Sequence, residues 1–288
     1  MTRKGIILAA GRGTRLYPMT LGVNKQLLPI YDKPMIYYPL SLFLHAGIKE
    51  ILLIVDPDDL TAFKNILGDG SRFGVSLSYE VQIEKKGIAD AFNIGEKFLN
   101  GSPSCLILGD NFLNGKDFDK LLREAASHTE GAVIFGYKVA DPERFGVVTF
   151  NERGEAISLV EKPKNSQSPY AVPGIYFYDS NAPSLVKKIT PSDRGELEIT
   201  DLNKLYLTEG NLHVKTIPED VVWFDTGTYD SLLEASVYVQ KEQKRTGTPI
   251  ANLESLAYSY GYSSLDSLQE SAQKFSKTSY GEYLHSLL

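Results

Sequence analysis

A glycine-rich turn follows the first apolar run of the chain and offers groups that could hold phosphate. The run Gly5–Ala10 has the length of a buried strand, and Gly11, Gly13 and Arg15 come directly after it. Glycines let the backbone approach phosphate oxygens with its N–H groups, and an arginine adds a bidentate positive charge. In an open α/β sheet, ligands bind outside the carboxyl ends of the strands, where this turn would lie. The turn is therefore a candidate phosphate site, although an ordinary strand-to-helix turn has the same short pattern.

Two familiar phosphate-binding motifs do not fit this turn. A Rossmann dinucleotide site needs a third glycine at the position that Leu16 occupies, and a P-loop needs Gly-Lys-Ser/Thr. Here Gly13 is followed by Thr14 and Arg15. The turn thus indicates phosphate binding of another kind.

Composition and charge exclude several classes of protein. The 288 residues are 42% hydrophobic and 23% charged, as in globular proteins, and suffice for one large domain with an appendage or for two domains. Because the net charge is −6, no general positive field attracts nucleic acid or anionic lipid. The run Gly5–Ala10 is too short for a signal peptide or a membrane span, and the single Cys105 excludes an intramolecular disulfide. We therefore expect a cytoplasmic protein without nucleic-acid or membrane partners, whose anionic ligands bind a local cluster of cations.

The spacing of apolar residues predicts an α/β fold. In the first half, runs of strand length alternate with segments of helical period, which is typical of βαβ units and a parallel sheet. The predicted strands there are Gly5–Ala10, Ile51–Val55, Leu77–Val81 and Ser104–Leu108, and the predicted helices are Met35–Ala46, Asp59–Leu67, Ile88–Leu99 and Asp117–Ser127. Further strands are predicted over Ala132–Val139, Val147–Phe150, Ile157–Glu161 and Gly174–Tyr178, without regular crossover helices. We predict a Rossmann-like, mostly parallel central sheet with a mixed second half.

The C-terminal part has a different character. A strand that ends at Val221–Phe224 precedes a long predicted helix, Tyr229–Arg245. After Gly247 and Pro249, the sequence becomes rich in Ser and Tyr and shows only short helical periods. We expect one main unit over residues 1–246 and a small helical appendage over residues 247–288.

A series of motifs in fixed order runs along nearly the whole chain. After the glycine-rich turn come Lys25–Leu40, Leu67–Gly70, Leu108–Asn111, Asp141–Val148, Glu161–Pro163, Arg194–Thr200 and Asp225–Thr228. In this order and length, the motifs resemble the sugar nucleotidylyltransferases, and most closely those that transfer a thymidylyl group. The resemblance places the nucleotide in the part of about residues 1–140 and the sugar in the part of about residues 141–230.

The resemblance implies that the oxygen of glucose 1-phosphate attacks the α-phosphorus of dTTP, which releases pyrophosphate and leaves dTDP-glucose for deoxysugars such as rhamnose. Both substrates are polyanions, so the site must offset their repulsion and the charge that builds on the bridging and leaving oxygens. Mg²⁺ takes oxygen ligands and retains water and phosphate, so carboxylates at strand ends would hold it. The resemblance also implies a homo-oligomer, a tetramer.

Roles for individual residues follow from the same resemblance. Arg15 and Lys25 would bind the triphosphate, with Arg15 stabilising the departing pyrophosphate, and Lys162 and Arg194 would bind the sugar phosphate. Ala10, Gly11, Gly13, Thr14, Gln26 and Asp110 would contact the nucleotide, and Gln82 and Gly87 its base. Glu161, Gly146, Val172 and Tyr176 would hold the sugar, and Asp110 and Asp225 the Mg²⁺.

The base loop departs from the pattern of the family. Many relatives have Gln-Pro-Ser-Pro-Asp-Gly where this chain runs from Gln82 to Gly87 through Ile-Glu-Lys-Lys. Thymine and uracil differ by one methyl group, which is worth about 1 to 3 kcal/mol of discrimination in such pockets. UTP therefore remains an alternative substrate. Two further alternatives are the same reaction with another sugar 1-phosphate and a binding protein without catalysis.

Overall fold

A ten-stranded sheet crosses the molecule, which the structure, a computed structural model, describes over residues 2–288. Its parallel part consists of β6 (Ser104–Leu108), β1 (Lys4–Ala9), β4 (Glu50–Val55) and β5 (Ser76–Val81), in that spatial order. These strands match the predicted ones to within a residue or two. The glycine-rich turn begins after β1, at the carboxyl edge of this parallel part, where ligand sites of α/β sheets lie.

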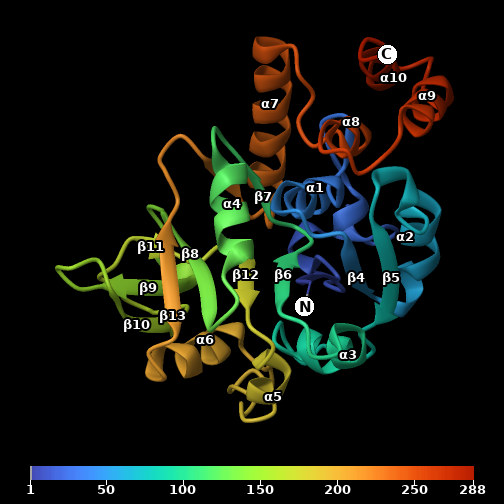
Figure 1. The fold of residues 1–288 in the computed structure, drawn as a ribbon. Coiled ribbons are helices and arrows are strands. Elements are labelled where there is room, and N and C mark those ends of the chain that lie inside the picture. The colour runs from blue at the N-terminus through green and yellow to red at the C-terminus, as the bar shows by residue number, and fades with distance from the viewer. Residues whose placement is uncertain (1) are drawn as a thin grey trace.

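The second half of the sheet is mixed, as predicted. It contains β8 (Ala132–Lys138), β9 (Gly146–Phe150), β10 (Ala156–Glu161), β11 (Tyr170–Ala171), β12 (Ile175–Tyr178) and β13 (Leu212–Thr216). Strand β12 pairs antiparallel with both β6 and β8 and so joins the two halves into one sheet. The predicted Rossmann-like α/β fold is thereby confirmed (Figure 1).

Helices cover both faces of the sheet because alternate strand residues point to opposite sides. One face, with Ile7 of β1, packs against α1 (Tyr37–Ala46), α2 (Leu60–Leu67), α4 (Phe118–Ser127) and α8 (Leu253–Ser259). The other face, with Ile6, packs against α3 (Asp90–Leu99), α5 (Ala182–Val186) and α6 (Ile199–Thr208). These two layers fix the strand ends from which the site is built.

The structure also contains two pairs of very short strands, of which only the last strand in the chain was predicted, within the strand that ends at Phe224, because strands of two or three residues carry little periodic signal. They are the hairpin of β2 (Pro29–Ile30) with β3 (Lys33–Pro34), and the antiparallel pair of β7 (Phe112–Asn114) with β14 (Val222–Phe224). Both pack under α7 (Tyr229–Thr246), where their side chains form a third apolar cluster.

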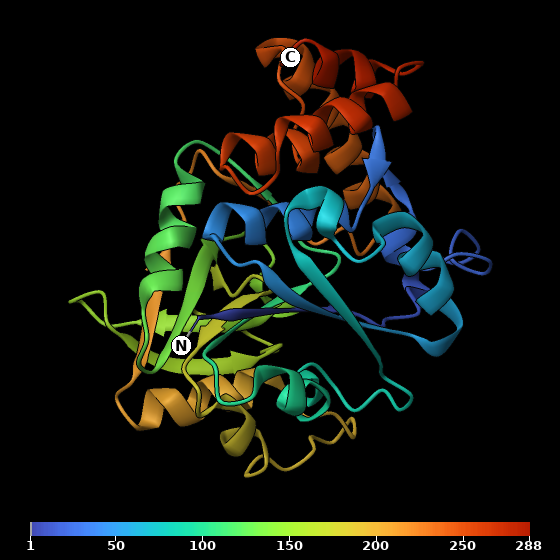
Figure 2. The ribbon, with the colours of Figure 1, turned by 45° about the vertical axis from the view of Figure 1, so that its right-hand side comes forward.

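The C-terminal helices α8, α9 (Leu265–Lys274) and α10 (Ser279–His285) lie together at one end of the molecule, as Figure 2 shows. Helix α8 packs on α1, and Leu253 of α8 belongs to the main core. No helix within residues 2–288 is long and apolar enough to cross a membrane.

Candidate functional site

A cavity of about 710 Å³ opens where the two halves of the sheet meet. Of the residues predicted from the sequence, it is lined by Thr14, Arg15, Asp110, Gly146, Glu161, Lys162, Val172, Tyr176, Arg194 and Asp225. These residues come from several segments that are far apart in the sequence, between Thr14 and Asp225. The tertiary structure therefore brings most of the predicted site residues to one place.

The pairing of β7 with β14 brings the two predicted metal carboxylates to the same end of a small sheet. Phe112 pairs with Phe224 in this antiparallel ladder, so the residues just before β7 and just after β14 come together. Asp225 directly follows β14, and Asp110 lies two residues before β7. Thr226 ties them further, because its hydroxyl donates to the carbonyl oxygen of Asp110 at 2.7 Å.

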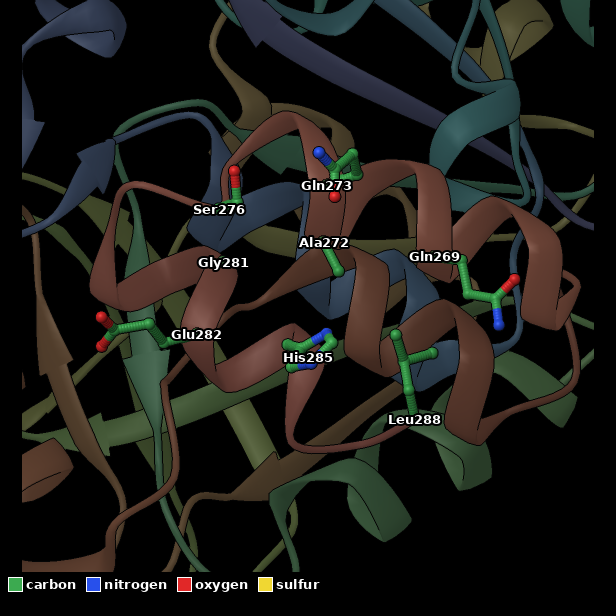
Figure 3. Close-up of a pocket in the computed structure, with 8 residues that line it drawn as sticks. All are labelled: Gln269, Ala272, Gln273, Ser276, Gly281, Glu282, His285 and Leu288. Carbon is green, nitrogen blue, oxygen red and sulfur yellow. The ribbon is translucent and has the colours of Figure 1, made fainter.

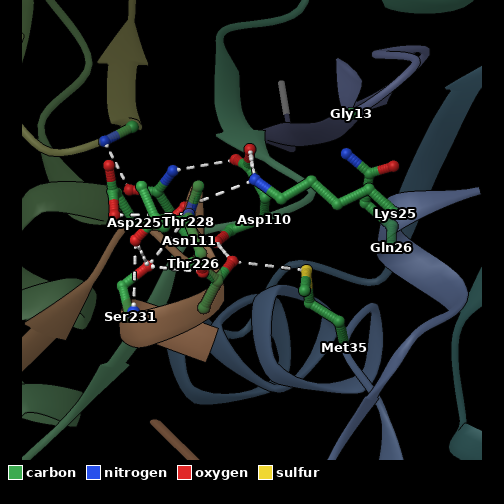
Figure 4. Close-up of polar contacts among 12 residues, drawn as sticks. Gly13, Lys25, Gln26, Met35, Asp110, Asn111, Asp225, Thr226, Thr228 and Ser231 are labelled. Atoms are coloured by element: carbon green, nitrogen blue, oxygen red, sulfur yellow. Dashed lines mark hydrogen bonds and ion pairs between the residues drawn. The ribbon is translucent and has the colours of Figure 1, made fainter. Parts of the chain in front are cut away.

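Lys25 lies between these two loops. Its Nζ atom donates to Oδ2 of Asp110 at 2.6 Å and to the carbonyl oxygen of Asp225 at 3.5 Å (Figure 4). The Lys25 side chain is only 5% exposed, whereas that of Asp110 is 26% exposed toward the cavity. The lysine thus supplies a buried positive charge directly behind a carboxylate that a ligand can reach.

Two arginines flank Asp225. Nη2 of Arg144 lies 2.7 Å from Oδ2 of Asp225, and Nη1 of the same guanidinium lies 2.8 Å from Asp141. A Cβ added to Gly227 would meet both terminal nitrogens of Arg15 and Oδ2 of Asp225, each at 3.2 Å. Arg15 therefore points into the corner that holds Asp225.

The glycine-rich turn packs closely on Lys25. Gly13 has φ +61°, and a Cβ there would lie 3.0 Å from Cβ of Lys25. Gly11 has open space where its Cβ would be, so the backbone of the turn is accessible from that side. This arrangement agrees with a turn that presents N–H groups to an anion.

Gln26 carries a buried polar atom that lacks a partner. Its side chain is 3% exposed, and Oε1 forms no hydrogen bond to any residue that the structure describes. A buried acceptor left unpaired costs about 1 to 3 kcal/mol. A bound molecule with a hydroxyl or N–H donor would satisfy this oxygen.

Acidic and basic side chains alternate on the other wall of the cavity. Oε2 of Glu161 accepts from Thr200 Oγ1 at 2.6 Å, and Nζ of Lys162 lies 3.6 Å from Oε1 of Glu161. Nη2 of Arg194 lies 2.8 Å from Glu198, and it also approaches Glu196 and Glu161 at 3.3 and 3.7 Å. Lys162 and Arg194 are about half exposed, so both cations can turn toward an anion in the cavity.

Gly146, Val172 and Tyr176 form the apolar part of this wall. The amide of Val172 donates to the carbonyl oxygen of Gly146 at 2.8 Å, so these two atoms bind each other. Burial, with the negative charges of Glu161 and Asp110, raises the pKa of Tyr176. Its hydroxyl therefore stays protonated near neutral pH and can act as a hydrogen-bond donor but not as a base.

Gln82 and Gly87 lie outside the residues that line this cavity, in the loop between β5 and α3. Nε2 of Gln82 donates to Oδ2 of Asp90 at 3.2 Å and to the carbonyl oxygen of Gly87 at 3.4 Å. Ala10, which is buried at the end of the first strand, and Gln26 also lie beside the cavity rather than in its lining. These positions surround the glycine-rich turn along the carboxyl edge of the parallel strands.

Sequence reasoning missed three residues that help to build the site. Arg144 binds Asp225, as described above. Asn111 accepts from the amide of Gly174 at 2.9 Å and from Nε1 of Trp223 at 2.8 Å, and it donates to Asp110. Arg144 stands within the motif Asp141–Val148, and Asn111 follows Asp110, so both had a sequence signal; the place of Trp223 depends on the unpredicted pairing of β14 with β7.

Asp110 and Asp225 suit a hard divalent cation. Carboxylate oxygens are ligands that Mg²⁺ prefers, and it commonly uses one or two of them together with water and substrate phosphates. Each carboxylate already contacts a cationic side chain, Asp110 that of Lys25 and Asp225 that of Arg144, so each has room for a positive group beside it. Within residues 2–288, no group of three or more His, Cys, Asp or Glu side chains could hold a metal ion alone.

A second cavity, of about 500 Å³, lies between α9 and α10 (Figure 3). Its lining includes Gln269, Gln273, Glu282 and His285 but none of the predicted site residues. It lacks the cluster of cations that a polyanionic ligand needs.

Comparisons with known proteins show the family to which the chain belongs. The family described as nucleotidyl transferase matches residues 4–242. A glucose-1-phosphate thymidylyltransferase from Neisseria meningitidis is 52% identical, and one from Xanthomonas campestris is 48% identical; the alignments cover 99% of this chain and 99% and 97% of those proteins. A Bacillus anthracis structure in complex with sucrose, described as this type of enzyme, has a TM-score of 0.77 at 42% identity over 82% of this chain and 95% of that one.

Proposed function

Because the chain belongs to the nucleotidyl transferase family, we propose that it is a glucose-1-phosphate thymidylyltransferase, which converts dTTP and α-D-glucose 1-phosphate to dTDP-glucose and pyrophosphate. Relatives that carry this name match the chain over 99% of its length. The observation that supports the proposal most directly is the convergence of Asp110, Asp225 and Arg15 on one cavity.

The reaction places negative charge from two substrates at one point, and the cations around the cavity are suited to offset it. Arg15 and Lys25 bind the triphosphate in this proposal, and Arg15 stabilises the pyrophosphate as it leaves. Lys162, with Arg194, binds the phosphate of the sugar from the opposite wall. Cations on two sides favour an in-line approach of the attacking oxygen to the α-phosphorus.

Asp110 and Asp225 would hold Mg²⁺, which when bound supplies a positive charge to the phosphate oxygens. Lys25 and Arg144 keep these carboxylates oriented through contacts of 2.6 and 2.7 Å. No side chain needs to act as a covalent nucleophile, and the sugar phosphate is already ionised near neutral pH. The protein therefore needs no general base.

The two substrates are recognised by groups at the ends of different strands. Gln82 and the backbone of Gly87 read the imide edge of the base, and the unpaired Oε1 of Gln26 accepts a donor from the nucleotide. Glu161 accepts hydrogen bonds from hydroxyls of the sugar, because a carboxylate can accept two of them. Tyr176 lines the same pocket and stays protonated.

Pyrophosphate release tests the proposal. We expect release from dTTP only when glucose 1-phosphate and Mg²⁺ are both present, and none after addition of EDTA. Binding of dTDP-glucose without any release would instead identify a non-catalytic binding protein. A panel of nucleoside triphosphates and sugar 1-phosphates, ranked by kcat/KM, decides whether dTTP is preferred over UTP.

We also propose a homotetramer and a main unit over residues 1–246 with an appendage over 247–288. Tyr229, Leu233 and Val237 recur every four residues on α7 and are 48%, 64% and 38% exposed, so they form an apolar stripe that a second copy could cover. Light scattering of the protein and of a Leu233→Glu variant would test this. A monomeric wild-type protein would refute the tetramer.

A further inference from the structure

The loop that links β5 to α3, residues 82–87, carries the residues assigned to the nucleobase. We propose that the ion pair between Lys85 and Asp56 holds this loop in the conformation that reads the base, so that Lys85 is a positioning residue for nucleotide binding. The inference rests on the proposed function, in which Gln82 and Gly87 contact the base.

Lys85 crosses from the loop to a neighbouring strand end. Its Nζ atom lies 2.7 Å from Oδ2 of Asp56, the residue that follows β4, and it also donates to the carbonyl oxygen of Gln82 at 3.2 Å. One ammonium group thus closes the loop on itself and fixes it to the sheet. The Gln82 side chain is held by Asp90 and Gly87, and the Lys85 contact adds a tie at the backbone carbonyl oxygen of the same residue.

The surroundings of Asp56 favour an ion pair with a cation. Its side chain is 11% exposed, and Oδ1 accepts from the amide of Asp58. Partial burial raises the pKa of Asp56, but hydrogen bonds from Lys85 and Asp58 and the positive charges of Lys85 and Arg12 outweigh it and lower that pKa below its usual value. Asp56 therefore stays charged near neutral pH, between the base loop and the glycine-rich turn that carries Arg12.

The other flank of the loop is fixed by the backbone. The amide of Leu197 donates to the carbonyl oxygen of Lys86 at 2.7 Å, and the amide of Ala89 donates to the carbonyl oxygen of Leu197 at 3.1 Å. Gly87 has φ +97°, and a Cβ there would lie 2.5 Å from the carbonyl oxygen of Leu197. The amide of Gln82 also donates to the carbonyl oxygen of Val55 at 2.9 Å, so removal of the Lys85 contact would loosen mainly the stretch between these two flanks, residues 83–85.

Lys86 provides a matched control. It is the next residue, carries the same charge, and pairs at 2.7 Å with Glu84 of the same loop, so its ion pair fixes the loop to no other element. If charge alone mattered, Lys85→Met and Lys86→Met would have equal effects. If the crossing contact matters, only Lys85→Met would weaken nucleotide binding.

The experiment measures the KM for dTTP, the KM for glucose 1-phosphate and kcat in the full-length protein. We expect Lys85→Met and Asp56→Asn each to raise the KM for dTTP about two- to fivefold, the range of a partly exposed ion pair, with kcat unchanged. The double variant should be no worse than either single variant, and the reversal Asp56→Lys with Lys85→Asp should restore part of the loss.

Thymidine is a second probe, because it lacks phosphate and its binding is not screened directly by salt. We expect its Kd to rise with NaCl in the wild type and to be insensitive to NaCl in Lys85→Met. If Lys85→Met and Lys86→Met changed the KM for dTTP and the Kd for thymidine equally, in a protein that binds thymidine and turns over dTTP, the proposed role of Lys85 would be refuted, while the proposed function would stand. A wild-type protein that neither binds thymidine nor uses dTTP would refute the proposed function instead.

Discussion

The Nζ atom of Lys25 lies 2.6 Å from Oδ2 of Asp110, and this contact joins two loops that are 85 residues apart in the sequence. The lysine amine is buried and the carboxylate faces the cavity. The hydrogen bond from Lys25 orients the Asp110 carboxylate, so that its exposed part faces a ligand in the cavity. The contact therefore positions the Asp110 carboxylate, which in the proposed reaction holds a divalent cation.

Replacement of either carboxylate should remove most of the activity. Asp110→Asn and Asp225→Asn are each expected to lower kcat by about 10² to 10³, the effect of one well-placed electrostatic group. Mg²⁺ titrations of turnover would measure this loss. Asp117→Asn changes an exposed carboxylate that pairs with Lys120 and should keep full activity. Near-normal rates in the first two variants would exclude their role as metal ligands.

Arg144 should matter more for turnover than for stability. Its pair with Asp225 is partly exposed, so Arg144→Met should lower the free energy of unfolding by less than about 1 kcal/mol. Because Asp225 loses the partner that orients it, kcat/KM is expected to fall about tenfold. Arg153→Met, in the exposed turn between β9 and β10, is the control for loss of an arginine. A large drop in Tm with unchanged kcat/KM would contradict this view.

Lys162 and Arg15 should affect different substrates. Lys162→Ala is expected to raise the KM for glucose 1-phosphate about tenfold or more, because it removes the cation beside Glu161. Arg15→Ala should instead lower kcat, since Arg15 faces the corner at Asp225 where charge on the leaving pyrophosphate is offset. Steady-state kinetics with each substrate varied in turn would separate the two effects, with Lys164→Ala as control. Equal effects of both variants on both substrates would remove the distinction.

A methyl group at Gly87 should disturb the base loop. Gly87→Ala adds a Cβ at 2.5 Å from the carbonyl oxygen of Leu197 and places alanine at φ +97°, so it should cost about 1 to 3 kcal/mol of stability and raise the KM for dTTP. Gly154→Ala has a positive φ as well, but nothing lies within 4 Å of the added Cβ. Gly154→Ala therefore measures the cost in stability of placing alanine at a positive φ without a steric clash. Thermal unfolding and steady-state kinetics would measure both variants. We expect Gly154→Ala to lower the Tm less than Gly87→Ala does and to leave the KM for dTTP unchanged.

His45 should make the protein less stable in mild acid. It donates or accepts a hydrogen bond with the Tyr260 hydroxyl at 2.8 Å, and burial, aided by the charge of Arg123 and opposed by Asp119, lowers its pKa from 6.5. The unfolded chain then binds the proton more readily than the folded one, so stability is present above pH 6.5 and is lost as the pH falls toward the lower folded pKa. Urea unfolding between pH 7.5 and 5 should show this slope, and His45→Asn should reduce it.

The sequence by itself determined the order of the longer strands and helices in the first half of the chain and the chemical groups of the site. Residues such as Gly13, Lys25 and Asp110 stand in motifs whose order and spacing can be read directly, and the alternation of apolar runs defined β1, β4, β5 and β6. These signals are local, because secondary structure and turn chemistry depend on residues that are close in sequence.

Only the tertiary structure decided which of these groups touch. The pairing of β7 with β14 sets Asp225 beside Asp110, and the contacts of Arg144 with Asp225 and of Lys85 with Asp56 each cross between elements far apart in the chain. Such contacts depend on how two helical layers and a mixed sheet pack, and no periodic pattern in one segment records its partner in another. The sequence thus supplied the charges of the site, and the packing of the sheet placed them.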